Sequence, residues 1–278
     1  MSEAYFAAAV QMCSGESKVA NLKAATRQVE KAAQLGAQVV ALPELFNCLG
    51  RTEIMLQEAE GIPGPTSEAM GRLARRLGII LVAGSICERD VEAGKVFNTC
   101  LLIDSSGQLQ ARYRKMHLFD IDLPGQVSYQ ESSWLSPGDD VVAVPTELGC
   151  FGLSICYDLR FPELYRRLIE AGAELLMVPA AFALATGKDH WQVLLRSRAI
   201  ENQVFVVAPN QFGQPTPQFT AYGRSTIIDP WGTSLAVAPD GESMILAQID
   251  PGRQQEIRRR LPALAHRRKV LERANRQD

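Results

Sequence analysis

The chain repeats one local pattern four times: apolar residues at helical spacing, a short turn, and then a run in which nearly every residue is apolar. The four copies cover residues 19–45, 67–86, 162–178 and 189–210. Apolar residues three and four apart predict an amphipathic helix, and a continuous apolar run predicts a strand that is buried on both faces. Helices that alternate with such strands are typical of a layered α/β protein.

Between these units the sequence indicates β-hairpins. Residues 98–104 and 108–115 flank a Ser-Ser-Gly turn, and residues 225–238 contain two strand-like runs around a Pro-Trp-Gly turn. Hairpin strands are antiparallel, so we predict mixed sheets. Two sets of strands with helices outside them suggest a four-layer α-β-β-α sandwich, although periodicity does not count the sheets.

Composition and charge exclude several classes of protein. The 278 residues are 46% hydrophobic and show no composition break, so we predict one domain over 1–278. The 29 Lys and Arg nearly balance 31 Asp and Glu, unlike in a general nucleic-acid binder. No apolar run approaches the roughly 18 residues of a membrane span. The N-terminus lacks the basic region of a signal peptide, so we expect no such segment. Six cysteines at low density without a CxxC pair are typical of a reduced, cytoplasmic protein.

The C-terminal end differs from the rest in charge. The last 28 residues hold nine basic and three acidic side chains, and we treat about 253–278 as a basic C-terminal arm. We expect the arm to dock on an acidic surface, often that of another subunit, as in a homodimer or homotetramer. Contact with a nucleic acid or a membrane is the alternative.

The cysteines point to thiol chemistry rather than to metal binding. Six cysteines form no CxxC pair, and no His, Cys and carboxylate cluster has ligand spacing, so we predict reduced thiols and no metal site. The run FGLSIC predicts a strand that ends at Cys156, and a helix is expected to begin near Pro162. A thiol at such a junction can attack a carbonyl or nitrile carbon while backbone N–H groups stabilise the oxyanion. The alternative is a cysteine that packs in the core.

A thiol nucleophile needs a base, and the chain offers few. Of the three histidines, His266 lies in the basic arm, His190 lies near a predicted helix start and His117 lies beside Lys115, so a Cys–His pair has little support. Glu44 is the better candidate, because it ends a strand among apolar neighbours that disfavour its charged form. Lys115 ends another strand and could stabilise a thiolate or an oxyanion. Taken singly, Glu44 could equally be a surface residue, and an isolated lysine such as Lys115 is usually one.

Together these residues resemble a known signature. The segments LPELF around Glu44, YRKMHLFD around Lys115 and ICYDLRFPEL around Cys156 are similar to the Glu-Lys-Cys motifs of the nitrilase, or carbon–nitrogen hydrolase, superfamily. The similarity runs from about residue 6 to 266, and TGKDHWQVLLRSRAIENQ and YGRSTIIDPWGT resemble its Nit branch. The resemblance implies an α-β-β-α sandwich that pairs through its outer helices, and an amidase without a cofactor.

The same resemblance implies a role for each site residue. Cys156 would be the nucleophile, Glu44 the base, and Lys115 an oxyanion donor helped by the backbone N–H of Tyr157. Glu131 matches a second carboxylate that positions the lysine and the substrate.

The resemblance also implies a class of substrate. The Nit branch hydrolyses deaminated glutathione to 2-oxoglutarate and cysteinylglycine or, as ω-amidase, releases ammonia from 2-oxoglutaramate or succinamate. We expect the first activity, with ω-amidase as the alternative. Both substrates carry a carboxylate, so we expect a cation in the pocket, Arg160, unless Arg160 pairs with Asp158 or Glu163. Tyr222 and Arg224 are further pocket candidates, and Arg224 stands where the branch usually has histidine.

Three other interpretations remain open at this point. The same thiol could attack a nitrile, the fold could be a catalytically silent scaffold that binds a partner, or the basic arm could bind nucleic acid. The complete set of Glu44, Lys115 and Cys156 argues against the scaffold, because a binding protein has no need of all three.

Overall fold

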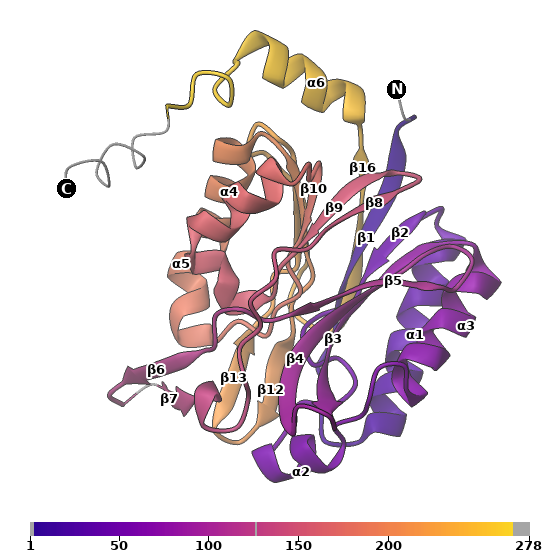
Figure 1. The fold of residues 1–278 in the computed structure, drawn as a ribbon, viewed down its shortest axis with the longest axis vertical. Helices are drawn as coiled ribbons and strands as arrows, with labels where there is room; N and C mark the ends of the chain where they lie inside the picture. The colour runs from indigo at the N-terminus through magenta and orange to yellow at the C-terminus, as the bar shows by residue number, and fades with distance from the viewer. Residues whose placement is uncertain (1–2, 126, 269–278) are drawn as a thin grey trace.

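The computed structural model describes residues 3–125 and 127–268, and Figure 1 shows how its layers stack. The strands of one six-stranded sheet are β1 (Tyr5–Gln11), β2 (Val39–Ala41), β3 (Ile80–Asp90), β4 (Lys95–Ile103), β5 (Leu109–Arg114) and β16 (Ser243–Ile249). Those of the other are β8 (Ala143–Thr146), β9 (Gly149–Leu153), β10 (Leu175–Met177), β11 (Phe205–Ala208), β14 (Thr226–Ile228) and β15 (Ser234–Val237). Their orders are β16-β1-β2-β3-β4-β5 and β15-β14-β11-β10-β9-β8.

Helices cover the outer face of each sheet. The first sheet carries α1 (Lys18–Gln34) and α3 (Pro65–Leu77), and the second carries α4 (Pro162–Glu170) and α5 (Leu184–Asn202) (Figure 1). The remaining elements are the helices α2 (Thr52–Gln57) and α6 (Pro251–Arg260), the hairpins β6 (Asp120–Leu123) with β7 (Val127–Gln130) and β12 (Phe212–Thr216) with β13 (Phe219–Tyr222), and short 3-10 turns at Glu131–Ser133 and Cys156–Arg160.

Burial on both faces explains the continuous apolar strands. In β1, Ala7 and Ala9 face the second sheet, whereas Ala8 and Val10 pack beneath the helices of the first. Strands β1, β2 and β3 pair in parallel, as do β9, β10 and β11, and the outer strands of both sheets pair antiparallel. The predicted four-layer α-β-β-α sandwich with two mixed sheets is therefore confirmed.

One predicted boundary is wrong. The strand expected to end at Cys156 ends at Leu153, and a 3-10 turn begins at Cys156. The backbone explains the difference, because Cys156 has a φ of +48° and its N–H donates to Pro179 O at 2.9 Å instead of joining the sheet. The helix expected near Pro162 does begin there.

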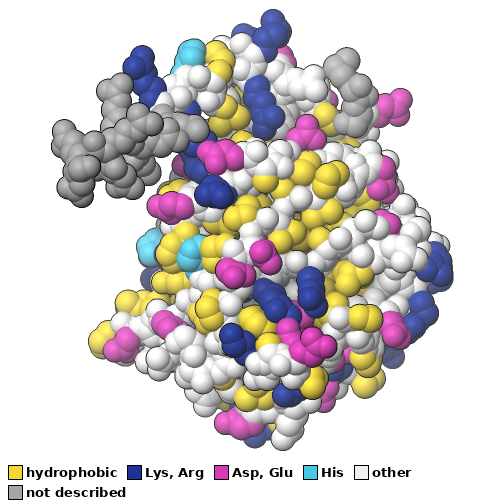
Figure 2. Space-filling view, viewed as in Figure 1, with side chains coloured by type: hydrophobic (Ala, Val, Ile, Leu, Met, Phe, Trp, Pro, Cys, Tyr) yellow, Lys and Arg dark blue, Asp and Glu magenta, His cyan; other side chains and the backbone are white. Residues whose placement is uncertain are grey.

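The described part of the basic arm contacts its own chain. Helix α6 is held to the end of α5 where Gln203 Nε2 donates to Leu261 O at 2.6 Å, and Arg267 pairs with Glu170 of α4 at 2.8 Å. Residues 269–278 of the arm lie outside the described residues. Figure 2 shows acidic and basic side chains interspersed over the coloured part of the viewed face. None of the helices described is long and apolar enough to cross a membrane.

Candidate active site

Four ionisable or nucleophilic side chains from the ends of different strands meet in one pocket. Glu44 follows β2, Lys115 follows β5, Glu131 follows β7, and Cys156 follows β9. All four line one pocket of about 220 Å³ and are only 2% to 7% exposed. Loops after different strands thus bring together residues as far apart in the sequence as Glu44 and Cys156, which are separated by 112 positions.

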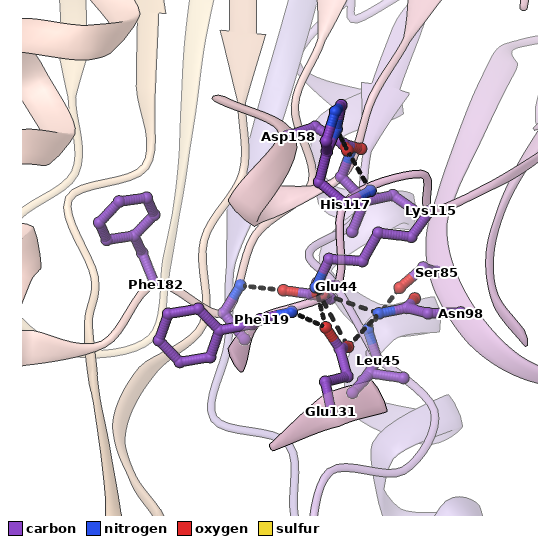
Figure 3. Close-up of polar contacts among 12 residues, drawn as sticks. Glu44, Leu45, Ser85, Asn98, Lys115, His117, Phe119, Glu131, Asp158 and Phe182 are labelled. Atoms are coloured by element: carbon purple, nitrogen blue, oxygen red, sulfur yellow. Dashed lines mark hydrogen bonds and ion pairs between the residues drawn. The ribbon is translucent and has the colours of Figure 1, made fainter. Parts of the chain in front are cut away.

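The Lys115 ammonium lies between two carboxylates, as Figure 3 shows. Its Nζ donates to Glu44 Oε1 at 2.9 Å and to Glu131 Oε2 at 2.9 Å. The other carboxylate oxygen of Glu44 accepts from the Ala181 N–H at 2.8 Å, and Glu131 Oε2 also accepts from the Phe119 N–H at 2.6 Å. Each carboxylate is therefore fixed in orientation, as a base that must meet a reacting atom needs to be.

Electrostatics keep the lysine charged and the thiol neutral at rest. Burial alone would lower the pKa of Lys115, but the charges of Glu131 and Glu44 outweigh it and hold that pKa well above its ordinary value. Burial and the neighbouring Glu44 raise the pKa of the Cys156 thiol well above its ordinary value, against the opposing effect of Lys115. A neutral thiol must lose its proton as it attacks, so it needs a base at hand, and Glu44 is in place.

The turn at Cys156 presents one free backbone donor. The Cys156 N–H is occupied by Pro179 O, and the Asp158 N–H donates to Ile155 O at 3.0 Å. Between them, the Tyr157 N–H has no hydrogen-bond partner within 3–125 and 127–268. The first N–H groups of a helical turn lack partners inside the turn and can bind an anion.

Asn98 is a site residue that the sequence analysis missed. Its Nδ2 donates to Glu44 Oε1 at 2.8 Å and to Glu131 Oε1 at 3.4 Å, so one amide bridges both carboxylates. The residue is completely buried in β4. An amide inside the apolar run VFNTCLLI was the available signal, because a buried polar group needs a partner.

Asn98 should therefore matter for stability as well as for geometry. Asn98→Leu removes two donors from buried carboxylates and is expected to lower the free energy of unfolding by about 1–3 kcal/mol. Asn98→Asp keeps the shape but adds a third carboxylate, so its loss should be larger. Urea unfolding of both variants checks this order, and an Asn98→Asp protein more stable than Asn98→Leu would contradict it.

Arg160 lies on the pocket wall, where its guanidinium contacts aromatic rings. Its guanidinium carbon is 5.6 Å from the ring centre of Tyr157 and 5.2 Å from that of Phe182, and its Nη1 lies 3.1 Å from His190 Nδ1. No ion pair joins it to an acidic group of the residues described, so the alternative of pairing with Asp158 or Glu163 is not what the structure has. Tyr157 lines the same pocket.

Tyr222 and Arg224 do not line this pocket. The Tyr222 side chain packs on Gly187 of α5, where a Cβ would come within 2.5 Å of it. Arg224 pairs with Asp240 at 2.9 Å and donates to Ala238 O. The sequence motif suggested that both residues lie near the site, but Tyr222 at the end of β13 and Arg224 in the loop before β14 make their contacts elsewhere.

Neither do the histidines supply the base. His117 Nδ1 lies 2.7 Å from Asp158 Oδ1 and the ring stacks on Phe161, and none of the three histidines lines the pocket. Within the ranges described, no group of three or more His, Cys, Asp and Glu could hold a metal ion. The arrangement places a thiol, an oriented carboxylate, a buried ammonium and a second cation around one pocket, and such a set can carry out covalent acyl transfer from a carboxylate-bearing amide.

Comparison with known proteins agrees with this chemistry. The carbon–nitrogen hydrolase family model matches residues 6–259. Omega-amidase NIT2 of Xenopus tropicalis is 42% identical over 94% of this chain and 94% of its own, and the deaminated glutathione amidase of Synechocystis is 43% identical over 95% and 98%. The solved structure of Saccharomyces cerevisiae Nit3, a member of branch 10 of the nitrilase superfamily, has 36% identity and a TM-score of 0.86 over 94% of this chain and 95% of its own. The chain therefore belongs to the carbon–nitrogen hydrolase family.

Proposed function

We propose that this protein is a cysteine-dependent amidase that hydrolyses deaminated glutathione to 2-oxoglutarate and cysteinylglycine. One observation carries the proposal: a buried Glu44–Lys115–Glu131 cluster lies beside Cys156 in a pocket whose wall also holds the guanidinium of Arg160. The relatives named for this activity and for ω-amidase are about equally similar. ω-Amidase activity on 2-oxoglutaramate or succinamate is therefore the second candidate.

Acylation uses the groups in the order in which they contact the substrate. Cys156 Sγ attacks the amide carbon while Glu44 takes the thiol proton. The negative charge that develops on the carbonyl oxygen is stabilised by Lys115 Nζ and the Tyr157 N–H. The C–N bond then breaks, Glu44 returns its proton to the leaving nitrogen, and the acyl group remains on sulfur as a thioester.

Deacylation reuses the same base. Glu44 takes a proton from water as the water oxygen attacks the thioester carbon. Lys115 and Tyr157 again stabilise the oxyanion, the C–S bond breaks, and Glu44 returns the proton to sulfur. Glu131 holds Lys115 in place through both steps, since it accepts from Nζ at 2.9 Å. The products are a carboxylic acid and an amine or ammonia.

Substrate choice depends on what lies around the leaving group. Arg160 suits the carboxylate of the acyl part, which both substrates share. The pocket lining also contains polar side chains besides the reacting groups and Arg160: Arg51, Thr52, Ser128 and Gln218. An ammonia leaving group needs no such contacts, whereas a dipeptide leaving group can use them, so we favour deaminated glutathione.

The deciding experiment compares the two substrates on one protein. Release of 2-oxoglutarate from deaminated glutathione and from 2-oxoglutaramate is measured, with a variant that lacks the Cys156 thiol as the control. We expect a higher kcat/KM for deaminated glutathione. A higher value for 2-oxoglutaramate would assign ω-amidase activity with the same mechanism, and turnover of neither would reject both assignments.

Arg160 is expected to recognise the carboxylate. In Arg160→Gln the KM for succinamate should rise by about 10- to 100-fold, because a hydrogen bond to a charged group contributes about 1.5–3 kcal/mol. Butyramide, which lacks the carboxylate, is the matched control and should be hydrolysed equally by both proteins. An equal loss with both amides would mean that Arg160 shapes the pocket instead.

We also propose that the chain forms one catalytic domain that pairs as a homodimer through its outer helix layer. Val193 and Ile200 of α5, and Trp231 in the turn between β14 and β15, are large apolar side chains that are 48% to 63% exposed. Sedimentation velocity tests this, and Val193→Glu should shift a dimer towards monomer. A reduced, cytoplasmic setting is proposed because all six cysteines are unpaired.

A further inference from the structure

The carboxylate of Asp158 lies two residues after the nucleophile and is completely buried. Its Oδ2 accepts from the Ile155 N–H at 2.8 Å and from Tyr113 Oη at 2.7 Å. Its Oδ1 accepts from the His117 N–H at 3.0 Å and from His117 Nδ1 at 2.7 Å. Three of these four contacts are donated to the carboxylate, and we assign the fourth as a donor too, with its proton on His117 Nδ1.

These partners lie on both sides of Lys115. Tyr113 precedes the lysine by two residues and His117 follows it by two. The Tyr113 hydroxyl also accepts from the Met116 N–H at 3.2 Å, which closes the loop around the lysine. Figure 3 shows His117 and Asp158 paired on one side of the Lys115 backbone, while the lysine side chain extends the other way to Glu44 and Glu131.

The same carboxylate also supports the turn that carries the nucleophile. Cys156 has a φ of +48°, a backbone conformation that a non-glycine residue keeps only when its surroundings impose it. Two hydrogen bonds between Asp158 and Ile155 span Cys156. The Asp158 N–H donates to Ile155 O, and the Ile155 N–H donates to the Asp158 carboxylate. On the far side of the turn, Arg198 Nη2 donates to Leu159 O at 2.8 Å.

We propose that Asp158, Tyr113 and His117 form a clip that sets the distance between Lys115 and Cys156. The clip residues are positioning residues, since neither His117 nor Asp158 lines the pocket. The inference rests on the proposed function, in which the oxyanion must meet both Lys115 Nζ and the Tyr157 N–H. A displacement of about 1 Å between reacting groups can lower a rate about 100-fold. The clip thus acts on kcat rather than on substrate binding.

His117 gives the sharpest test, because it is partly exposed and a matched pair of substitutions is available. His117→Ala removes both the ring stack on Phe161 and the Nδ1–H donor. His117→Asn also removes the stack but keeps an N–H at the position of Nδ1. We expect kcat to fall by about 10- to 100-fold in His117→Ala with KM nearly unchanged, and to recover mostly in His117→Asn.

A second readout needs no substrate. The rate at which iodoacetamide alkylates Cys156, followed by mass spectrometry, should fall in His117→Ala and recover in His117→Asn, because Lys115 stabilises the thiolate only from its proper position. Tyr113→Phe removes one donor from Asp158 at nearly constant volume and should show a smaller fall in both measurements.

Three results would overturn the clip. Equal losses in the Ala and Asn variants would mean that the bond to Asp158 is not used. A raised KM with unchanged kcat would place His117 on the substrate. A lower melting temperature with unchanged kcat and alkylation rate would make the contact purely structural. If the unaltered protein hydrolyses neither substrate, the proposed function fails, but the alkylation rates still decide whether the clip acts on Cys156.

Discussion

Cys156→Ala is expected to lower kcat/KM by more than about 10⁴-fold, because removing a catalytic nucleophile leaves only binding and oxyanion stabilisation. The assay is 2-oxoglutarate release from deaminated glutathione and from 2-oxoglutaramate. Cys150→Ala is the matched control, since that thiol is half-buried and lies outside the pocket, and it should retain full activity. A folded Cys156→Ala protein with full turnover would exclude the thioester mechanism.

The same position should show a conflict between stability and activity. With a φ of +48°, Cys156 stands in a region that costs a non-glycine residue about 1 kcal/mol or more. Cys156→Gly is therefore expected to be more stable than Cys156→Ala by about 1 kcal/mol in urea unfolding, with both inactive. An alanine variant as stable as the glycine variant would show that the turn stores no strain.

Apolar patterns predicted the layers well for a physical reason. A strand between a second sheet and a helix layer is buried on both faces, so consecutive residues such as Ala8 and Ala9 must both be apolar. That requirement is local and visible in the sequence. It predicted the central strands and the position of Glu44 after one of them, while helical spacing predicted the helices and hairpin turns predicted the mixed sheets.

Contacts between distant segments left weaker signals. Asn98 and Asp158 are each surrounded by partners from other parts of the chain, and a single polar letter in an apolar run does not say which carboxylate or backbone group it will meet. The reverse error occurred at Arg224, whose place in a motif suggested the pocket although its partner is Asp240. Pairing in space is set by sheet order, which periodicity does not contain.

The charge balance of the buried cluster makes Lys115 the other residue with a large expected effect. Lys115→Met leaves Glu44 and Glu131 as two buried carboxylates without their cation. Removing one partner of a buried ion pair costs about 3–5 kcal/mol of stability, and loss of one oxyanion donor lowers kcat by about 10²- to 10³-fold. Both losses should appear together, in urea unfolding and in steady-state kinetics.

A double variant separates the two effects. Glu44, Glu131 and Lys115 together carry a charge of −1, Lys115→Met alone makes it −2, and adding Glu131→Gln restores −1. The glutamine oxygen can still accept from the Phe119 N–H, and its amide can donate to Glu44. Lys115→Met with Glu131→Gln should therefore regain much of the lost stability but none of the lost kcat, because no ammonium faces the oxyanion. Recovery of turnover along with stability would mean that Lys115 serves only to neutralise the two carboxylates.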